Sequence, residues 1–144
     1  MDAGEWLQVQ ANLVELGQSI EKWTHTEPDP LALRCEYSRH RTLAHLRACQ
    51  EQWLVVLRAF AERDNPCVTV LHPWRHFEAM GYAALPWDVH MAAYLEGRQE
   101  WIRLCRQTDP NRGGKWNRKP DSVGGLVWRL VSHEHHHISS LRNA

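Results

Sequence analysis

Two histidines one helical turn apart, with a glutamate between them, stand near the C-terminal end of the chain. The segment reads His133-Glu134-His135-His136-His137 and lies within a run that has the apolar period of a helix. On that helix His133, Glu134 and His137 lie on or beside the apolar stripe, where leucine would be expected. Because imidazoles at i and i+4 converge on one cation, and because burying them unpaired is costly, the spacing predicts a divalent-metal site. The alternative is a pair of partly exposed histidines near a fraying helix end.

The same pentad matches the His-Glu-x-x-His motif of zinc proteases, in which the glutamate is a general base. Those enzymes take a third ligand downstream, but the residues after His137 include no His, Asp, Glu or Cys. A protease is therefore excluded, and the third ligand must come from upstream. Di-iron chemistry is also excluded, because only Glu134 to His137 has the Glu-x-x-His spacing that it needs.

Apolar residues at helical spacing predict the elements that must position these side chains. The stripes indicate helices over about residues 4–23, 38–63 and 86–107, and a fourth that begins at a cap on Asp121 or Ser122 and extends to Leu141. The run 68–71 is strand-like but short, and residues 24–30 are expected to form a loop. We therefore expect an all-α four-helix bundle and a single domain over residues 1–144.

The connection between the second and third helices sets the expected topology. It is about 22 residues long, whereas a helix of twenty residues spans about 30 Å, so the chain can cross back along the bundle. This predicts an up-down-down-up order, with the second and fourth helices antiparallel. His45 then lies opposite the pair His133 and His137, at the edge of the second helix's apolar face, and is the expected third ligand.

Several other side chains have a chemical and a structural interpretation. The third helix should begin beside the metal, so Trp87, Met91 and His90 are expected to face the site. Tyr94 either faces the site or, as we expect, is an ordinary core aromatic. Arg98 either binds a substrate anion or pairs with an acid, and Cys49 and Cys105 are either soft ligands or small core residues. Four further histidines are weaker ligand candidates: His40, His72, His76 and His90. Pro73 confines any helix at His72 and His76 to its start.

Composition excludes several classes of partner. The chain has 17 Lys and Arg against 17 Asp and Glu, so its formal net charge of 0 does not attract polyanions. The basic segment 112–119 contains Gly-Gly and is expected to be a solvated loop, not a nucleic-acid site. No run of eighteen apolar residues and no signal-peptide pattern occurs, and the four cysteines form no Cys-x-x-Cys pair. We expect a cytoplasmic protein without membrane or nucleic-acid partners.

Two segments together resemble the DinB/YfiT-like family of metal-binding four-helix bundles. They are Leu43-Ala-His45-Leu-Arg-Ala-Cys-Gln-Glu-Gln-Trp53-Leu and Gly125-Leu-Val-Trp-Arg-Leu-Val-Ser-His133-Glu-His-His-His137. The resemblance covers nearly the whole chain. The family signature is a histidine on the second helix and His-x-x-x-His on the last, often with an acidic residue directly after the first histidine of that pair; His45, His133, His137 and Glu134 stand at those positions. The chain departs from the family at Gln50 or Glu51, where members often carry an acid, and in its early end at Ala144.

The resemblance implies one divalent metal ion, for which zinc, nickel, iron and manganese are all compatible, held by His45, His133 and His137 with coordination positions left open. It implies a small-molecule substrate and transfer of a low-molecular-weight thiol. A metal-dependent hydrolase and a non-catalytic metal-binding stress-response protein are the alternatives, and a homodimer is an open option. Glu134 is expected to act at the site, either by orienting a ligand histidine such as His45 or as a general base.

Overall fold

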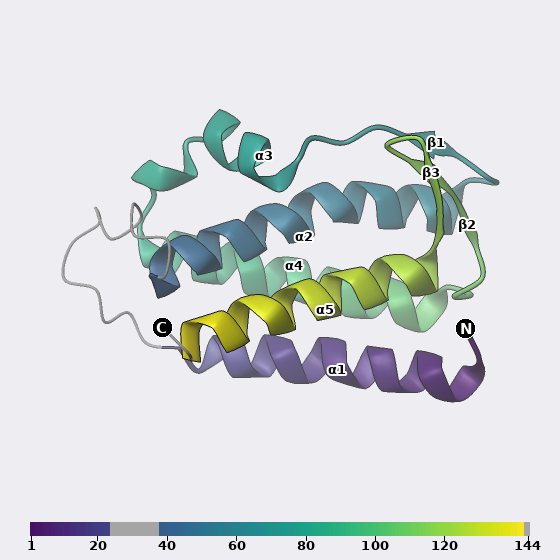
Figure 1. The fold of residues 1–144 in the computed structure, drawn as a ribbon, viewed down its shortest axis with the longest axis horizontal. Helices are drawn as coiled ribbons and strands as arrows, with labels where there is room; N and C mark the ends of the chain where they lie inside the picture. The colour runs from purple at the N-terminus through teal and green to yellow at the C-terminus, as the bar shows by residue number, and fades with distance from the viewer. Residues whose placement is uncertain (24–37, 143–144) are drawn as a thin grey trace.

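The structure is a computed structural model that describes residues 1–23 and 38–142, so the loop expected at residues 24–30 lies outside the described residues. Helices account for most of the described chain, and a small sheet joins them (Figure 1). The α-helices are α1 (Ala3–Glu21), α2 (Arg39–Glu62), α3 (Pro73–Ala79), α4 (Trp87–Gln107) and α5 (Val123–Arg142), with a short 3-10 helix, η2 (Tyr82–Ala84). The strands are β1 (Cys67–Val68), β2 (Gly113–Trp116) and β3 (Lys119–Ser122).

The four long helices are those that the apolar stripes predict, and the boundaries estimated from the sequence lie within two residues of the observed ones. Polar side chains at the N-termini explain where two of them begin. Asp2 accepts a hydrogen bond from the backbone N–H of Glu5 at 2.8 Å, and Ser38 accepts one from the N–H of Arg41 at 3.0 Å. Each cap satisfies a donor that the first helical turn leaves without a partner.

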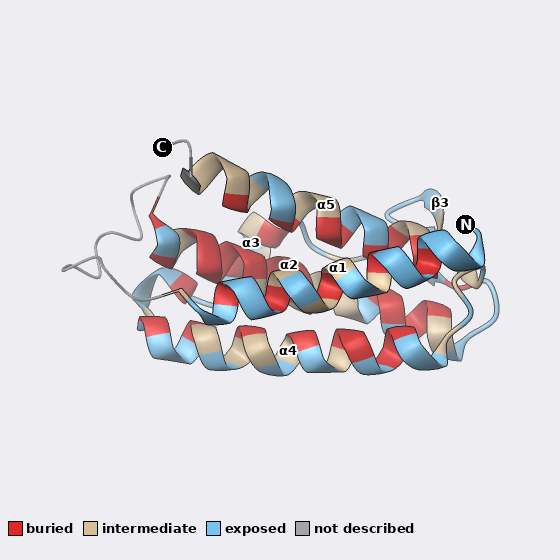
Figure 2. Cartoon of the chain, turned by 90° about the horizontal axis from the view of Figure 1, so that it is seen from below, coloured by how far each residue is buried: buried red, intermediate tan, exposed pale blue. Residues whose placement is uncertain are grey.

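Each long helix packs against two others: α2 contacts α4 and α5, and α1 contacts the same two helices. The buried residues form stripes along the inward faces of the helices (Figure 2). The first residues of α2 lie beside the last turns of α5, since His45 meets His133 and His137. The first residues of α2 also lie beside the start of α4, where His40 meets Trp87.

The expectation that residues 112–119 form only a solvated loop is wrong. β2 pairs antiparallel with β3 and parallel with β1, so the segment is a hairpin added to the edge of the bundle. Glycine makes the pairing close: a Cβ at Gly114 would clash with the Pro66 carbonyl oxygen, and one at Gly113 with that of Asp121. Gly113 and Gly114, which indicated a loop, thus allow the backbones of neighbouring segments to approach β2 closely.

The long connection between α2 and α4 is folded, not extended. It contains β1, α3 and η2, and α3 packs along α2 (Figure 1). Pro73 occupies the first helical position of α3, as expected, and the His72 side chain accepts a hydrogen bond from the N–H of Trp74 at 3.2 Å. This start sets Trp74 against α2.

None of the helices in the described part of the chain has both the length and the apolar composition of a membrane span.

Candidate metal centre and its cavities

Three imidazole rings from α2 and α5 meet on one side of the bundle. The ring centroids of His45 and His133 are 5.2 Å apart, those of His45 and His137 4.8 Å, and those of His133 and His137 4.5 Å. The Nε2 atoms of His133 and His137 lie 3.2 Å from each other. Two features produce this convergence: the i, i+4 spacing on α5, and the antiparallel contact of α5 with α2.

Burial keeps these imidazoles neutral. Burial, followed by the charge of neighbouring histidines, lowers the pKa of His45 to about 2 and that of His133 to about 4. The pKa of His137 is also lowered, mainly by burial and then by His136. Neutral imidazole is the form that binds a metal ion. The Nδ1 atoms of His45 and His133 are buried and have no hydrogen-bond partner among the described residues, so both nitrogen atoms remain available to a ligand.

A second grouping of ligand atoms shares two of these residues. The ligand atoms of His45, Cys49 and His133 lie within 4.8 Å of one another, a spacing that could hold a metal ion. Cys49 is one turn after His45 on α2, and its Sγ lies 3.6 Å from Nε2 of His45. Burial, and then the nearby Glu134 carboxylate, raise the pKa of the Cys49 thiol well above its usual value, which disfavours the thiolate that binds metals.

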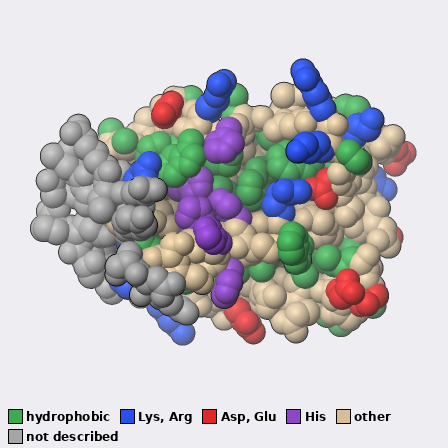
Figure 3. All heavy atoms as spheres, in the orientation of Figure 1, with side chains coloured by type: hydrophobic (Ala, Val, Ile, Leu, Met, Phe, Trp, Pro, Cys, Tyr) green, Lys and Arg blue, Asp and Glu red, His purple; other side chains and the backbone are tan. Residues whose placement is uncertain are grey.

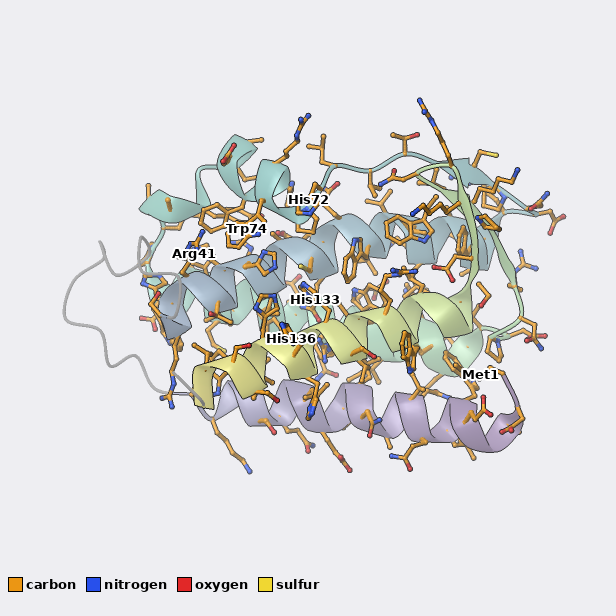
Figure 4. The ribbon with its side chains drawn as sticks, in the orientation of Figure 1. Met1, Arg41, His72, Trp74, His133 and His136 are labelled. Carbon is orange, nitrogen blue, oxygen red and sulfur yellow. The ribbon has the colours of Figure 1, made fainter. Side chains whose placement is uncertain are left out.

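Tryptophans enclose the three histidines. The indole of Trp74 stacks on His45 at 4.1 Å with the ring planes 15° apart, and Trp53 meets His133 edge-on at 5.4 Å. Figure 4 shows Trp74 between α3 and α2, and His133 on the side of α5 that faces α2. Neither tryptophan was predicted at the site, although the tryptophan count of 8 in 144 residues was a signal that large apolar walls were being built.

Two cavities open at this cluster. One of about 470 Å³ is lined by His45, His133 and His137 together with Trp53, Trp74 and Trp116, among others. The other, of about 290 Å³, is also lined by His45, His137 and Trp74, and Arg41 is among its other walls. Figure 3 shows histidine side chains gathered near the middle of this face, with Lys and Arg side chains around them. The cluster is thus reachable from outside.

Glu134 does not orient a histidine. It is fully buried, and its Oε1 accepts hydrogen bonds from the Arg98 guanidinium and from the Tyr94 hydroxyl, the latter at 2.9 Å. The expected contact with His45 is therefore not among its hydrogen bonds in the described structure. Arg98 pairs with an acid, which confirms the structural interpretation of that residue.

Histidines outside this trio make other contacts. His76 contacts Glu51 at 3.4 Å and Gln52 at 3.2 Å, and His90 lies 2.9 Å from the Tyr82 carbonyl oxygen. His72 lines the larger cavity but is not part of the converging trio. The expectation that the start of α4 faces the metal centre is wrong, because its residues line neither of the two cavities at the histidines. Trp87 and His90 meet His40 instead, and Tyr94 donates a hydrogen bond to Glu134.

A scan of protein-family models, a search of curated proteins and a search of solved structures found no match to this chain.

Proposed function

We propose that this chain is a DinB-like protein that holds one divalent metal ion through His45, His133 and His137 and activates a low-molecular-weight thiol for transfer to a second small molecule. The observation that carries the proposal is the convergence of three neutral imidazoles, with ring centroids 4.5 to 5.2 Å apart, at the junction of two open cavities. The family assignment itself rests on the resemblance of the two histidine segments.

The residues fit a metal ion on chemical grounds. Taking imidazole nitrogen atoms out of water is unfavourable unless something pairs with them, and two buried Nδ1 atoms have no partner among the described residues. A divalent ion on three neutral ligands would keep its full charge and lower the pKa of a bound thiol or water into the neutral range. Borderline ligands of this kind suit zinc or nickel and also admit iron or manganese.

The protein's own residues would hold and shield this chemistry. Trp74 stacks on His45 and fixes its ring plane, while Trp53 packs against His133. In the transfer, the thiol gives its proton to solvent, its sulfur forms a bond to an electrophilic carbon of the second substrate, and that carbon releases its leaving group with the bonding electrons. The tryptophan walls limit access of bulk water while the two cavities admit small molecules.

The open cavities favour a catalytic site over a purely structural one, because structural metal sites are closed by protein ligands. A hydrolase would use the same centre with water in place of the thiol. A non-catalytic stress-response protein would bind the metal without turnover. A screen of thiols and electrophiles distinguishes a thiol transferase from a hydrolase and from a protein without turnover.

We also infer that α1, α2, α4 and α5 make up a four-helix bundle in up-down-down-up order. Two contacts support it: α2 and α4 meet near their N-termini through His40 and Trp87, and the start of α2 meets the end of α5. The folded crossover of α3 and η2 provides the length that this order requires.

The metal is tested by elemental analysis of purified protein and of single-residue variants. We expect about one divalent ion per chain, and we expect His133→Ala and His137→Ala to weaken its binding by more than about 100-fold, since a lost ligand costs more than a lost supporting contact. His135→Ala is the matched control, because His135 is exposed on the same helix. Helicity, followed by circular dichroism, should be unchanged in all three.

The two ligand groupings make different predictions. With three histidine ligands, Cys49→Ala keeps its metal and His137→Ala loses it; with Cys49 as a ligand, the result is reversed. Metal retained in both His133→Ala and His137→Ala would contradict the proposal. A screen of thiols and electrophiles with metal-loaded protein, and with the His137→Ala variant as the blank, then tests the activity.

A further inference from the structure

The larger of the two cavities is lined by an arginine and, among the described residues, by no acid. Its floor holds the three histidines, and its apolar walls are the indoles of Trp53 and Trp116, whose centroids are 6.1 Å apart, together with Trp74. None of the described residues that line it is acidic, whereas Arg129 is among them. Because the proposed metal would add two positive charges, a ligand that fills this cavity should carry negative charge.

Arg129 is placed to contact such a ligand. It lies one turn before His133 and two turns before His137 on α5, so the three side chains share one face of the helix. One turn of helix separates its Cα from that of His133 by about 6 Å along the axis. A series of ring contacts joins the arginine to the histidines along the cavity wall: Arg129 lies over Trp116, Trp116 meets Trp53, and Trp53 meets His133.

Protein contacts orient the guanidinium of Arg129 but leave part of it exposed. Its side chain is 54% exposed, and it forms an ion pair with Asp121, with 3.9 Å between Nη2 and Oδ2. That carboxylate already accepts hydrogen bonds from the indole N–H of Trp116 at 2.9 Å and from the N–H of Ser122 at 2.8 Å. The guanidinium also lies 5.6 Å from the Trp116 ring centroid. These contacts hold Arg129 against the cavity wall and leave donors for a ligand.

We propose that Arg129 is a specificity-determining residue that binds the carboxylate, or a similar anionic group, of a small substrate whose apolar body lies against the tryptophans and whose other end reaches the three histidines. The inference deepens the proposed function and rests on it. It assigns the substrate class as an apolar or aromatic thiol that carries a carboxylate at the end remote from sulfur. A planar carboxylate suits the fork of an arginine, which can donate two parallel hydrogen bonds.

Arg41 provides the matched comparison. It lines the smaller cavity and stacks over Trp74, with 4.4 Å between its Cζ and the ring centroid. Like Arg129, it places a cation against an indole near the histidines, but it lines the smaller cavity. A substrate that uses the larger cavity should be sensitive to Arg129 and indifferent to Arg41.

The test uses the full chain loaded with Co²⁺, whose visible spectrum reports a ligand at the metal centre. The probes are 4-mercaptobenzoate and its neutral analogue 4-mercaptobenzamide, which differ only at the end remote from sulfur. We expect the wild-type protein to bind the carboxylate about tenfold more tightly, in keeping with one charge-assisted contact at a partly exposed site. Arg129→Gln should remove that preference, Arg129→Lys should keep part of it, and Arg41→Gln should leave it unchanged.

Each outcome decides the matter. Equal affinity for the two probes in the wild-type protein, or an undiminished preference in Arg129→Gln, would overturn the inference while leaving the metal site intact. Loss of the preference in Arg41→Gln alone would move the anion to the smaller cavity and overturn it as well. Failure of the wild-type protein to bind Co²⁺, or equal Co²⁺ binding by His133→Ala, would refute the proposed function instead.

Discussion

The pairing of Arg98 with Glu134 puts two charges in the centre of the bundle. Arg98 donates to Gln50 Oε1 at 2.6 Å and to the Leu13 carbonyl at 2.8 Å, as well as to Glu134. Burial alone would lower the pKa of the guanidinium, but the attraction of Glu134 outweighs it and the pKa is raised. Removing one charge of such a pair leaves the other buried without compensation.

We therefore expect Glu134→Gln to lower the free energy of unfolding by about 3 kcal/mol, the low end for a broken buried pair, because the amide keeps the shape but loses the charge. Urea denaturation followed by circular dichroism measures the change. The double variant Arg98→Met/Glu134→Leu should recover most of the lost stability, since an apolar replacement of a buried pair is often neutral. A fully stable Glu134→Gln protein that binds metal but has lost turnover would instead assign Glu134 a catalytic role.

The hairpin of β2 and β3 turns through two residues in the left-handed region of backbone space. Asn117 has φ 48° and Arg118 φ 72°, between the paired residues Trp116 and Lys119. Asparagine tolerates the first position, and here its backbone N–H donates to the Val68 carbonyl oxygen at 2.9 Å while its side chain accepts from the N–H of Val70 at 2.9 Å. Glycine is the preferred residue at the second position, so Arg118 is strained.

Arg118→Gly should accordingly raise the free energy of unfolding by about 1 kcal/mol, the cost of placing an L-residue in the left-handed region. Thermal or urea denaturation would detect it. Lys119→Gly is the control: it also removes an exposed cation from the hairpin, but β3 has extended backbone there, so it should be neutral or destabilising. Equal effects of the two changes would show that charge, and not backbone conformation, matters at the turn.

The distribution of histidines makes the stability of the whole molecule sensitive to pH. Burial lowers the pKa of His45 to about 2 and those of His90 and His133 to about 4, whereas an unfolded chain protonates histidine near pH 6.5. At a pH between the folded and unfolded pKa values, the unfolded state binds protons at these histidines and the folded state does not. The free energy of unfolding must fall as the pH falls from about 6.5 toward 4, and it is unaffected by these groups above about pH 7.5.

For metal-free protein, prepared with a chelator, we expect a loss of roughly 2 kcal/mol or more between pH 7 and pH 5, the contribution of at least one such histidine. Urea midpoints measured at half-unit steps provide the profile. The His90→Asn variant should show a shallower slope, because one of the three groups no longer titrates. A flat profile over this range would mean that the histidines are not buried in solution.

The amino-acid sequence predicts those features that depend on near neighbours along the chain. The apolar stripes locate the four long helices. The spacing of His133 and His137 puts two imidazoles on one helix face, because the period of a helix is the same in every fold. His45 follows with one added assumption, that its helix runs antiparallel to the last one. Whether these three residues bind metal stays a prediction.

The features that long-range packing controls could not be predicted in this way. Whether Glu134 meets a histidine or Arg98 depends on the rotation of α4 and α5 about their axes, and an apolar stripe defines that rotation only to within the width of a side chain. Trp74 stacks on His45 because the crossover folds back on α2, and Arg129 meets Trp116 because Gly113 and Gly114 let a hairpin form. Both contacts join residues far apart in the chain, where the shape of the assembled surfaces, and not any local pattern, selects the partner.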